Sequence, residues 1–184
     1  MSLRVIAGTA KGKKLLSVPG DTTRPVMDRV KEALFNILQG DVIDSSWWDL
    51  FGGTGAIGIE AISRGAAYVR FSELNRVAAE TILKNLANCH FSNQAEVRKG
   101  DAFSMLAAQA DKRFEYIYIA PPQYKEMWVK ALKLVDEQTN WLTDDGTVIV
   151  QIDPSEYQEV ELQNLVESEQ RKYGSTLLIF YDRL

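Results

Sequence analysis

The chain has 184 residues, of which 46% are hydrophobic and 25% charged, so one globular domain with a sizeable core is expected. Its single cysteine excludes an intramolecular disulfide, and no apolar run of about 18 residues could span a membrane. We therefore expect a cytoplasmic protein with no membrane partner.

The formal net charge of −4 is unevenly distributed along the chain. Residues 1–19 contain four basic side chains and no acidic one, whereas residues 136–170 contain ten acidic side chains and no basic one. This distribution suits a protein that meets a polyanion with one end only. A solvated acidic face with a basic tail would explain it equally well.

The first predicted elements are a β-hairpin and a helix. Residues 3–7 and 14–18, joined by a turn through residues 8–12, predict a small hairpin. Residues 26–39 predict a helix, because Val30, Leu34, Ile37 and Leu38 fall on one face and Gly40 is a suitable stop. We interpret residues 1–40 as an N-terminal extension and residues 41–184 as the main domain.

From residue 46 onward, strands and helices alternate. Strands are expected at 46–50, 68–72, 95–98, 116–120 and 146–151, and helices at 56–64, 77–87, 102–110 and 125–137. This alternation predicts an α/β fold with a doubly wound, mostly parallel, Rossmann-like sheet. Residues 159–166 and 175–181 are expected to add an antiparallel edge pair, joined through Tyr173-Gly174. In such a sheet, ligands bind beyond the carboxyl ends of the strands, so the loops after the first four strands are the candidate sites.

The loop after the first predicted strand is rich in glycine. Gly53, Gly55 and Gly58 match the pattern G-x-G-x-x-G, in which glycines permit a sharp turn and a close approach of a ligand. Asp49 stands four residues before the first of these glycines. Its carboxylate can accept a hydrogen bond from the amino group of an amino-acid-like ligand, such as the methionine moiety of S-adenosylmethionine.

The next two loops each offer a carboxylate. Glu73 ends the second predicted strand, where an acidic side chain can bind both hydroxyls of a ribose. Both S-adenosylmethionine and nicotinamide dinucleotides use this device, so Glu73 does not discriminate between them. Asp101 in the third loop either contacts an adenine amino group or caps the following helix.

The fourth loop, Ala120-Pro121-Pro122-Gln123-Tyr124, carries the most specific chemistry. Two prolines stiffen the backbone and remove two amide donors, which leaves carbonyl acceptors beside the expected cofactor site. When these carbonyls accept hydrogen bonds from both N–H groups of an exocyclic base amine, the amine becomes more pyramidal and its lone pair points at a methyl donor. The Tyr124 ring could stack on an extruded base.

Together these motifs resemble class I S-adenosylmethionine-dependent methyltransferases. More narrowly, the chain resembles the RsmD-type family of small-subunit (16S) ribosomal RNA guanine-N2 methyltransferases. The resemblance covers nearly the whole chain and rests on residues 4–8 (RVIAG), 11–15 (KGKKL), 23–36 (TRPVMDRVKEALFN), 49–58 (DLFGGTGAIG) and 60–65 (EAISRG). The segment 24–36 is the most specific part, since generic Rossmann enzymes lack it.

The resemblance implies a role for each group of candidate residues. It implies ribosomal RNA or a partly assembled small ribosomal subunit as partner, S-adenosylmethionine as cofactor, and no metal. The catalytic candidates are Pro121, Pro122, Gln123 and Tyr124; the cofactor candidates are Asp49, Phe51, Gly53, Gly55, Glu73, Asp101, Ala102 and Ala120; and the RNA-binding candidates are Arg4, Lys11, Lys13, Lys14, Arg24 and Arg29.

One residue departs from the family pattern. The family usually has Asp-Pro-Pro-Tyr or Asp-Pro-Pro-Phe in the fourth loop, whereas this chain has Ala120 and an additional Gln123 before Tyr124. The alanine side chain cannot accept a hydrogen bond from the amine, although the Pro121 carbonyl and the Gln123 side chain could. Two alternatives to guanine-N2 methylation therefore stay open: another base amine such as adenine N6, and an RNA-binding or ribosome-assembly protein without catalysis. A nicotinamide-dependent oxidoreductase also stays open, because it would explain the glycine loop, although not the Pro-Pro loop or the N-terminal segment.

Overall fold

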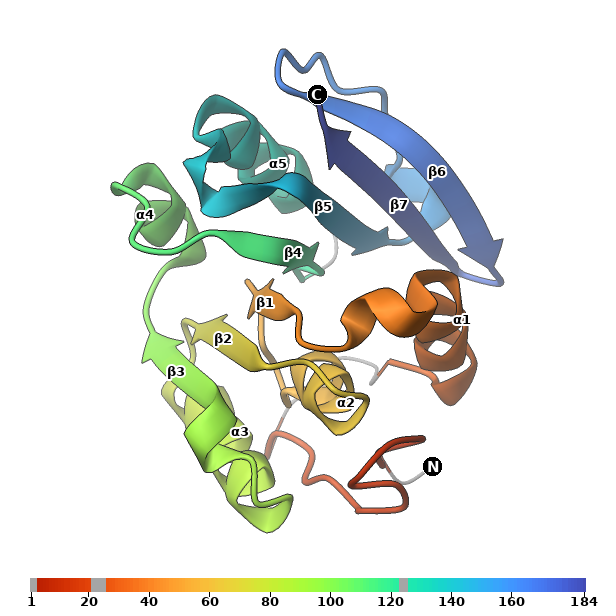
Figure 1. Cartoon of the computed structure of the whole chain (residues 1–184), viewed down its shortest axis with the longest axis vertical. Helices are drawn as coiled ribbons and strands as arrows, with labels where there is room; N and C mark the ends of the chain where they lie inside the picture. Colours follow the sequence, from red (N-terminus) through yellow and green to blue (C-terminus); the bar gives the residue numbers. More distant parts are fainter. Residues whose placement is uncertain (1–2, 21–25, 123–125) are drawn as a thin grey trace.

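The computed structural model describes residues 3–20, 26–122 and 126–184. The strands of these residues form one seven-stranded sheet in the order β3-β2-β1-β4-β5-β7-β6 (Figure 1). Neighbouring strands among β1 to β5 pair in parallel, whereas β7 pairs antiparallel with both β5 and β6. The predicted doubly wound sheet with an antiparallel edge pair is confirmed. The strand order reverses between β1 and β4, so a ligand is expected where these two strands end.

The bounds of the elements follow the predicted alternation closely. The strands are β1 (Ser46–Asp49), β2 (Tyr68–Glu73), β3 (Ala95–Lys99), β4 (Phe114–Ile119), β5 (Leu142–Ile152), β6 (Leu165–Tyr173) and β7 (Thr176–Arg183). The helices are α1 (Asp28–Leu38), α2 (Ala56–Ser63), α3 (Arg76–Asn88), α4 (Ala102–Ala107) and α5 (Met127–Glu137), with short 3-10 turns at Gln39–Val42, Ser92–Gln94, Thr139–Trp141 and Pro154–Glu156. No described helix is long and apolar enough to cross a bilayer.

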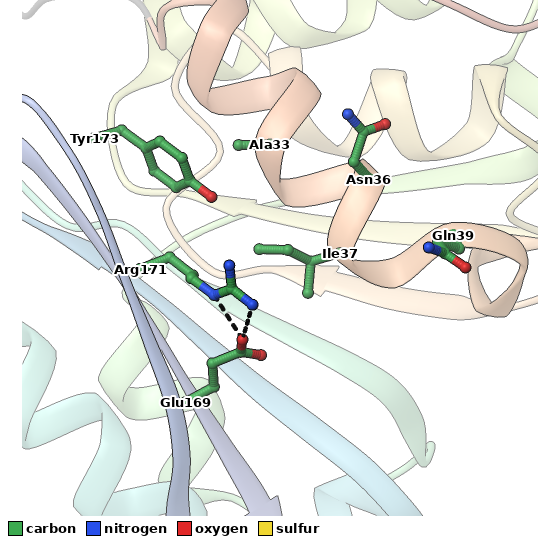
Figure 2. A pocket seen from close by; sticks show the side chains of 7 residues that line it. All are labelled: Ala33, Asn36, Ile37, Gln39, Glu169, Arg171 and Tyr173. Carbon is green, nitrogen blue, oxygen red and sulfur yellow. Dashed lines mark hydrogen bonds and ion pairs between the residues drawn. The ribbon is translucent and has the colours of Figure 1, made fainter.

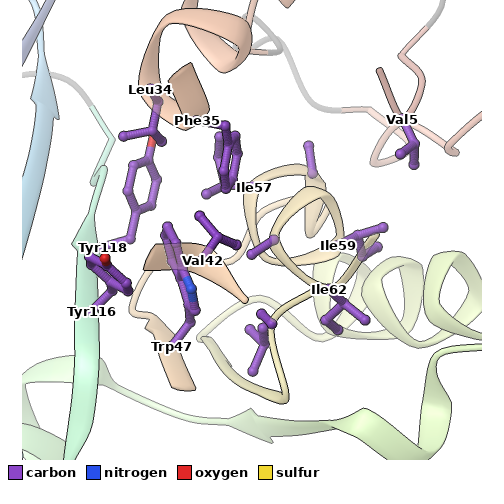
Figure 3. Close-up of a cluster of buried hydrophobic side chains, with 14 of the residues drawn as sticks. Val5, Leu34, Phe35, Val42, Trp47, Ile57, Ile59, Ile62, Tyr116 and Tyr118 are labelled. Atoms are coloured by element: carbon purple, nitrogen blue, oxygen red, sulfur yellow. The ribbon is translucent and has the colours of Figure 1, made fainter. Parts of the chain in front are cut away.

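Two hydrophobic clusters pack on opposite faces of the sheet. One joins α1, α2 and α3 to the sheet, and in it the Trp47 ring lies 5.7 Å from that of Phe35 and 4.7 Å from that of Tyr116 (Figure 3). The other lies under α4 and α5 and contains Trp48, the next residue of β1. Neighbouring residues of a strand point to opposite faces, so two adjacent buried tryptophans anchor both layers.

The C-terminal edge pair is displaced from its predicted position. The strand expected at 159–166 is wrong, because β6 begins only at Leu165. The buried carboxylate of Asp136, at the end of α5, accepts the backbone amides of residues 163, 164 and 165, so these amides bond a side chain just where the strand starts. The predicted turn at Tyr173-Gly174 is confirmed, since Tyr173 pairs with Thr176 and Gly174 has a φ of 59°.

The N-terminal segment folds back on itself but makes less sheet than predicted. Its two arms form one isolated bridge, between Arg4 and Lys14, instead of two full strands. The amides of Ile6 and Ala7 donate instead to the carboxylate of Glu60 in α2, at 3.0 and 3.1 Å. Long-range bonds to a helix thus replace the hydrogen bonds that would have extended the hairpin.

Candidate active site

The glycine loop connects β1 to α2 at the point where strand order reverses. Gly53 and Gly55 have φ values of 58° and 85°, a backbone conformation that favours glycine. Gly58 serves packing instead, because a Cβ there would lie 2.3 Å from the Phe71 ring of β2. The three glycines of the motif therefore divide into two that shape the turn and one that lets helix and strand approach closely.

Asp49, the last residue of β1, lies beneath this loop and is only 2% exposed. Burial raises the pKa of its carboxyl group to about 8, and the negative charge of Glu73 adds to this increase. A hydrogen bond from the Gly58 amide acts in the opposite direction and lowers the pKa. Its Oδ1 is buried and has no hydrogen-bond partner among the described residues. A buried acceptor without a donor is unfavourable, and a cationic ligand would relieve it.

Glu73, the last residue of β2, connects the glycine loop to the start of α3. Its carboxylate accepts the Gly53 amide at 3.0 Å and the Asn75 amide at 2.8 Å. The following residue, Leu74, is 69% exposed, although it is a large apolar side chain. Leu74 is not among the site residues predicted from the sequence, and the signal for it is its position directly after the strand-end acid.

Asp101 caps α4, one of its two predicted roles. It accepts the amides of Phe103 and Ser104 at 3.2 and 3.3 Å, and also the Ser104 hydroxyl at 2.9 Å. Ala102 beside it is buried. Phe51 of the glycine loop meets the Phe103 ring edge-on, with centroids 5.9 Å apart. This ring contact places the first loop against the start of α4.

The fourth loop leaves β4 beside Asp49, since Asp49 and Tyr118 are partners in the β1–β4 register. Ala120 packs against the cluster under α1, Pro121 is half-buried and Pro122 is exposed. Burial, with a smaller contribution from the charge of Asp49, raises the pKa of Tyr118 well above its ordinary value, so its hydroxyl stays protonated and donates to Gln151. The other two candidates of this loop, Gln123 and Tyr124, lie outside the described residues.

The basic candidates occupy different places. Lys11, Lys13 and Lys14 are exposed around the turn at Gly12, as a polyanion site requires. The guanidinium of Arg4 instead donates to Asp28 of α1 at 3.2 Å. Arg29 lies on α1, with its guanidinium 5.9 Å from the Tyr173 ring centroid. The remaining candidate, Arg24, lies outside the described residues.

Asn85 joins the N-terminal segment to the glycine loop. This fully buried residue of α3 accepts the Leu16 amide at 2.7 Å and donates to the carbonyls of Leu16 and Thr54 at 3.1 and 2.9 Å. Asn85 is not among the residues predicted from the sequence, although an asparagine seven residues after Ala78 on the apolar stripe of a helix is a usable signal.

Replacing Asn85 with leucine should cost about 2–4 kcal/mol, because the change leaves two carbonyls and an amide without partners. Urea unfolding followed by tryptophan fluorescence measures this cost. The matched control is Asn88→Leu at the exposed end of the same helix, which should change stability by less than about 0.5 kcal/mol. Equal effects of the two variants would contradict the role of the Asn85 bonds.

Among the described residues, no three His, Cys, Asp or Glu side chains are arranged to hold a metal ion. The sheet order, the glycine loop at its switch point and the carboxylates ending β1 and β2 define a class I methyltransferase fold. The solved structure of yhhF from Escherichia coli superposes with a TM-score of 0.86 at 31% identity, covering 100% of this chain and 98% of that one. An RNA methyltransferase from Salinibacter ruber, in complex with S-adenosyl-L-homocysteine, superposes with a TM-score of 0.65 at 16% identity, covering 87% of this chain and 94% of that one.

The chain belongs to the RsmD family: the family described as conserved hypothetical protein 95 matches residues 3–182. Ribosomal RNA small subunit methyltransferase D from Escherichia coli strain K12 is 34% identical over 149 residues, which cover 81% of this chain and 74% of that protein. The resemblance drawn from the sequence motifs is thereby confirmed.

Proposed function

We propose that this protein transfers the methyl group of S-adenosylmethionine to the exocyclic N2 amine of a guanine in small-subunit (16S) ribosomal RNA. The observation that carries the proposal is the buried Oδ1 of Asp49, which has no described partner and lies beside Glu73 and the glycine loop. The name of the Escherichia coli relative, a small-subunit ribosomal RNA methyltransferase, supports the class of substrate.

The donor set fits the proposed cofactor. Asp49 would accept the ammonium group, and Glu73 the ribose hydroxyls after giving up its bond to the Gly53 amide. The exposed Leu74 side chain would cover an aromatic base. The remaining cofactor candidates lie on the same edge of the sheet: Phe51, Gly53, Gly55, Asp101, Ala102 and Ala120. Bound S-adenosylmethionine supplies an electrophilic methyl group on a positively charged sulfur.

The fourth loop would orient the base amine. The Pro121 carbonyl would accept a hydrogen bond from one N–H of the amine and the Gln123 oxygen from the other, while Pro122 keeps the loop stiff and Tyr124 would stack on the base. The nitrogen lone pair forms the new bond to the methyl group as the sulfur–methyl bond breaks, and one amine proton then passes to solvent. Holding the amine in line with the methyl group lowers the barrier by orientation alone. Because Ala120 stands where the family usually has Asp, the loop lacks a charged hydrogen-bond acceptor at this position. Relative to a loop with the aspartate, the rate of methyl transfer is expected to be roughly 10- to 100-fold lower.

We assign the RNA contacts to residues 1–40, of which the described part packs on α2 and α3 of the core of residues 41–184. The exposed lysines at 11, 13 and 14 would contact phosphates, together with Arg24 and Arg29. Arg4 would first have to leave Asp28. The partner would be naked ribosomal RNA or a partly assembled small subunit.

Ala120 also favours a second candidate, an RNA-binding or ribosome-assembly protein that retains the fold without catalysis. The test is transfer of tritium from labelled S-adenosylmethionine to unmodified small-subunit RNA and to partly assembled subunits, with Ala120→Asp alongside. We expect label in N2-methylguanine, and more of it with Ala120→Asp. Label in N6-methyladenine would correct the target, and silence from both proteins despite cofactor binding would favour the second candidate.

A further inference from the structure

A groove of about 580 Å³ lies between α1 and β6, apart from the cofactor loops. Its walls are Ala33, Asn36 and Ile37 from α1, Gln39 from the 3-10 turn that follows, and Glu169, Arg171 and Tyr173 from the edge strand (Figure 2). Its volume lies within the usual range for small-ligand sites. The proposed function assigns no role to the side chains of Asn36, Arg171 or Tyr173.

Strand register fixes which β6 side chains face the groove. Arg171 pairs with Leu178, which belongs to the cluster under α1, so Arg171 points to that face of the sheet. The next residue, Lys172, pairs with Leu177 of the opposite cluster and points to the other face. A sequence change at Arg171 therefore affects the groove, whereas the same change at Lys172 does not.

The register also relates the groove to the fourth loop. Ile119 pairs with Val150, Val150 with Ile179, and Ile179 with Gln170, so Arg171 lies level with Ala120 across the sheet. The two positions are separated by three strand spacings, or about 14 Å. A few nucleotides of extended RNA span such a distance.

The groove walls have the chemistry of single-strand recognition. Tyr173 offers a half-buried aromatic ring and Asn36 an exposed side-chain amide. Arg171 and Glu169 form an ion pair at the groove wall, and about half of the Arg171 side chain is exposed. Arg29, on the same helix as Asn36, places a second guanidinium near the Tyr173 ring. An aromatic platform with adjoining cations and amides suits an unstacked base and its phosphate.

We propose that this groove binds a nucleotide flanking the target base, with the base stacked on Tyr173 and its phosphate or polar edge bonded to Arg171 and Asn36. The inference rests on the proposed function and deepens it, because it adds an RNA contact where the N-terminal extension meets the main domain. The groove would hold the RNA strand as it leaves the fourth loop, so that the target amine keeps its position.

The test measures filter retention of unmodified small-subunit RNA, together with KM and kcat for methyl transfer. Tyr173→Ala is expected to lower RNA affinity roughly 10- to 100-fold, while Tyr173→Phe keeps the ring and most of the affinity. Arg171→Ala is expected to raise KM for RNA several-fold with little change in kcat, and the affinity for S-adenosylhomocysteine should stay unchanged. Lys172→Ala is the matched control and should leave RNA binding as in the parent.

Parental RNA binding and KM in both Tyr173→Ala and Arg171→Ala would overturn the inference. Arg171 lies on the exposed edge strand, so its variant tests the groove even if Tyr173→Ala unfolds. If the parent protein itself transfers no methyl group, that result contradicts the proposed function and not the role of the groove. RNA retention of the variants is measured without turnover, so it tests the groove in that case too.

Discussion

Replacing Asp49 with asparagine is expected to abolish measurable cofactor binding and, at the same time, to stabilise the empty protein. Asparagine keeps an oxygen for the Gly58 amide but carries no charge for an ammonium group. Asp49 is only 2% exposed, and burial raises the pKa of its carboxyl group to about 8, so folding disfavours its ionised form. Asparagine is neutral, so the variant does not carry the free-energy cost of burying an ionised carboxylate.

The stabilisation should depend on pH with a definite sign. The pKa of Asp49 is higher in the folded protein than in the unfolded chain, so the folded state binds the extra proton between pH 4 and 8. The parent therefore loses stability as pH rises through this range, by at most about 4 kcal/mol between pH 4 and pH 7. Asp49→Asn has no such group, so its advantage over the parent should grow from pH 5 to pH 8.

Cofactor binding to the parent should show the linked effect. An ammonium beside Asp49 favours the ionised carboxylate, so binding releases a proton below pH 8. The affinity for S-adenosylhomocysteine should therefore rise between pH 6 and pH 7.5, by up to about tenfold per pH unit. Isothermal titration in buffers of different ionisation enthalpy detects the released proton.

Asp111→Asn is a control of opposite sign. Hydrogen bonds from Arg70 and Arg98 lower the pKa of Asp111 to about 2, so its stabilisation is complete above the unfolded value of about 4 and is lost as the pH falls toward 2. Its replacement should destabilise the protein equally at pH 5 and pH 8 and leave cofactor binding intact. Parental affinity of Asp49→Asn for S-adenosylhomocysteine would show that Asp49 supports the loop without contacting the ligand.

The parallel core could be predicted because its signals are local. Alternating strands and helices, a glycine loop and strand-end acids each occupy a few consecutive residues, so β1, α2 and β2 appear close to their predicted bounds. The carboxyl ends of neighbouring parallel strands then meet at one edge. Asp49, Glu73 and Asp101 could therefore be predicted to lie at one edge of the sheet, and their joint role in cofactor binding stays a prediction.

The remaining features depend on partners distant in sequence. Strand β6 begins where Asp136 takes up the preceding amides, and the N-terminal hairpin stays short because Glu60 does the same for Ile6 and Ala7. No pattern within either segment indicates such an acceptor. The groove likewise lies between α1 and β6, which are more than 100 residues apart in the sequence, so no local pattern indicates that they are neighbours.

Glu60→Ala is expected to be the most destabilising single change in the N-terminal half. The carboxylate is fully buried, accepts the amides of Ile6 and Ala7, and lies 3.4 Å from the Lys31 ammonium and 2.8 Å from Arg64. Removing it leaves Lys31, also fully buried, without its counter-charge. Breaking a buried ion pair on one side typically costs about 3–5 kcal/mol, or about 6–20 °C in Tm for a chain of this length.

Thermal unfolding measures this effect, with Glu80→Ala as the matched control. Glu80 also lies on a helix four residues from an arginine partner, but both side chains are largely exposed, so its loss should cost under about 0.5 kcal/mol. The double variant Glu60→Leu with Lys31→Met removes both charges and should recover part of the loss. Recovery is expected to be incomplete, because the amides of Ile6 and Ala7 still lack an acceptor. The stability that the double variant does not recover therefore measures how much these two hydrogen bonds contribute to holding the proposed RNA-binding segment on the core.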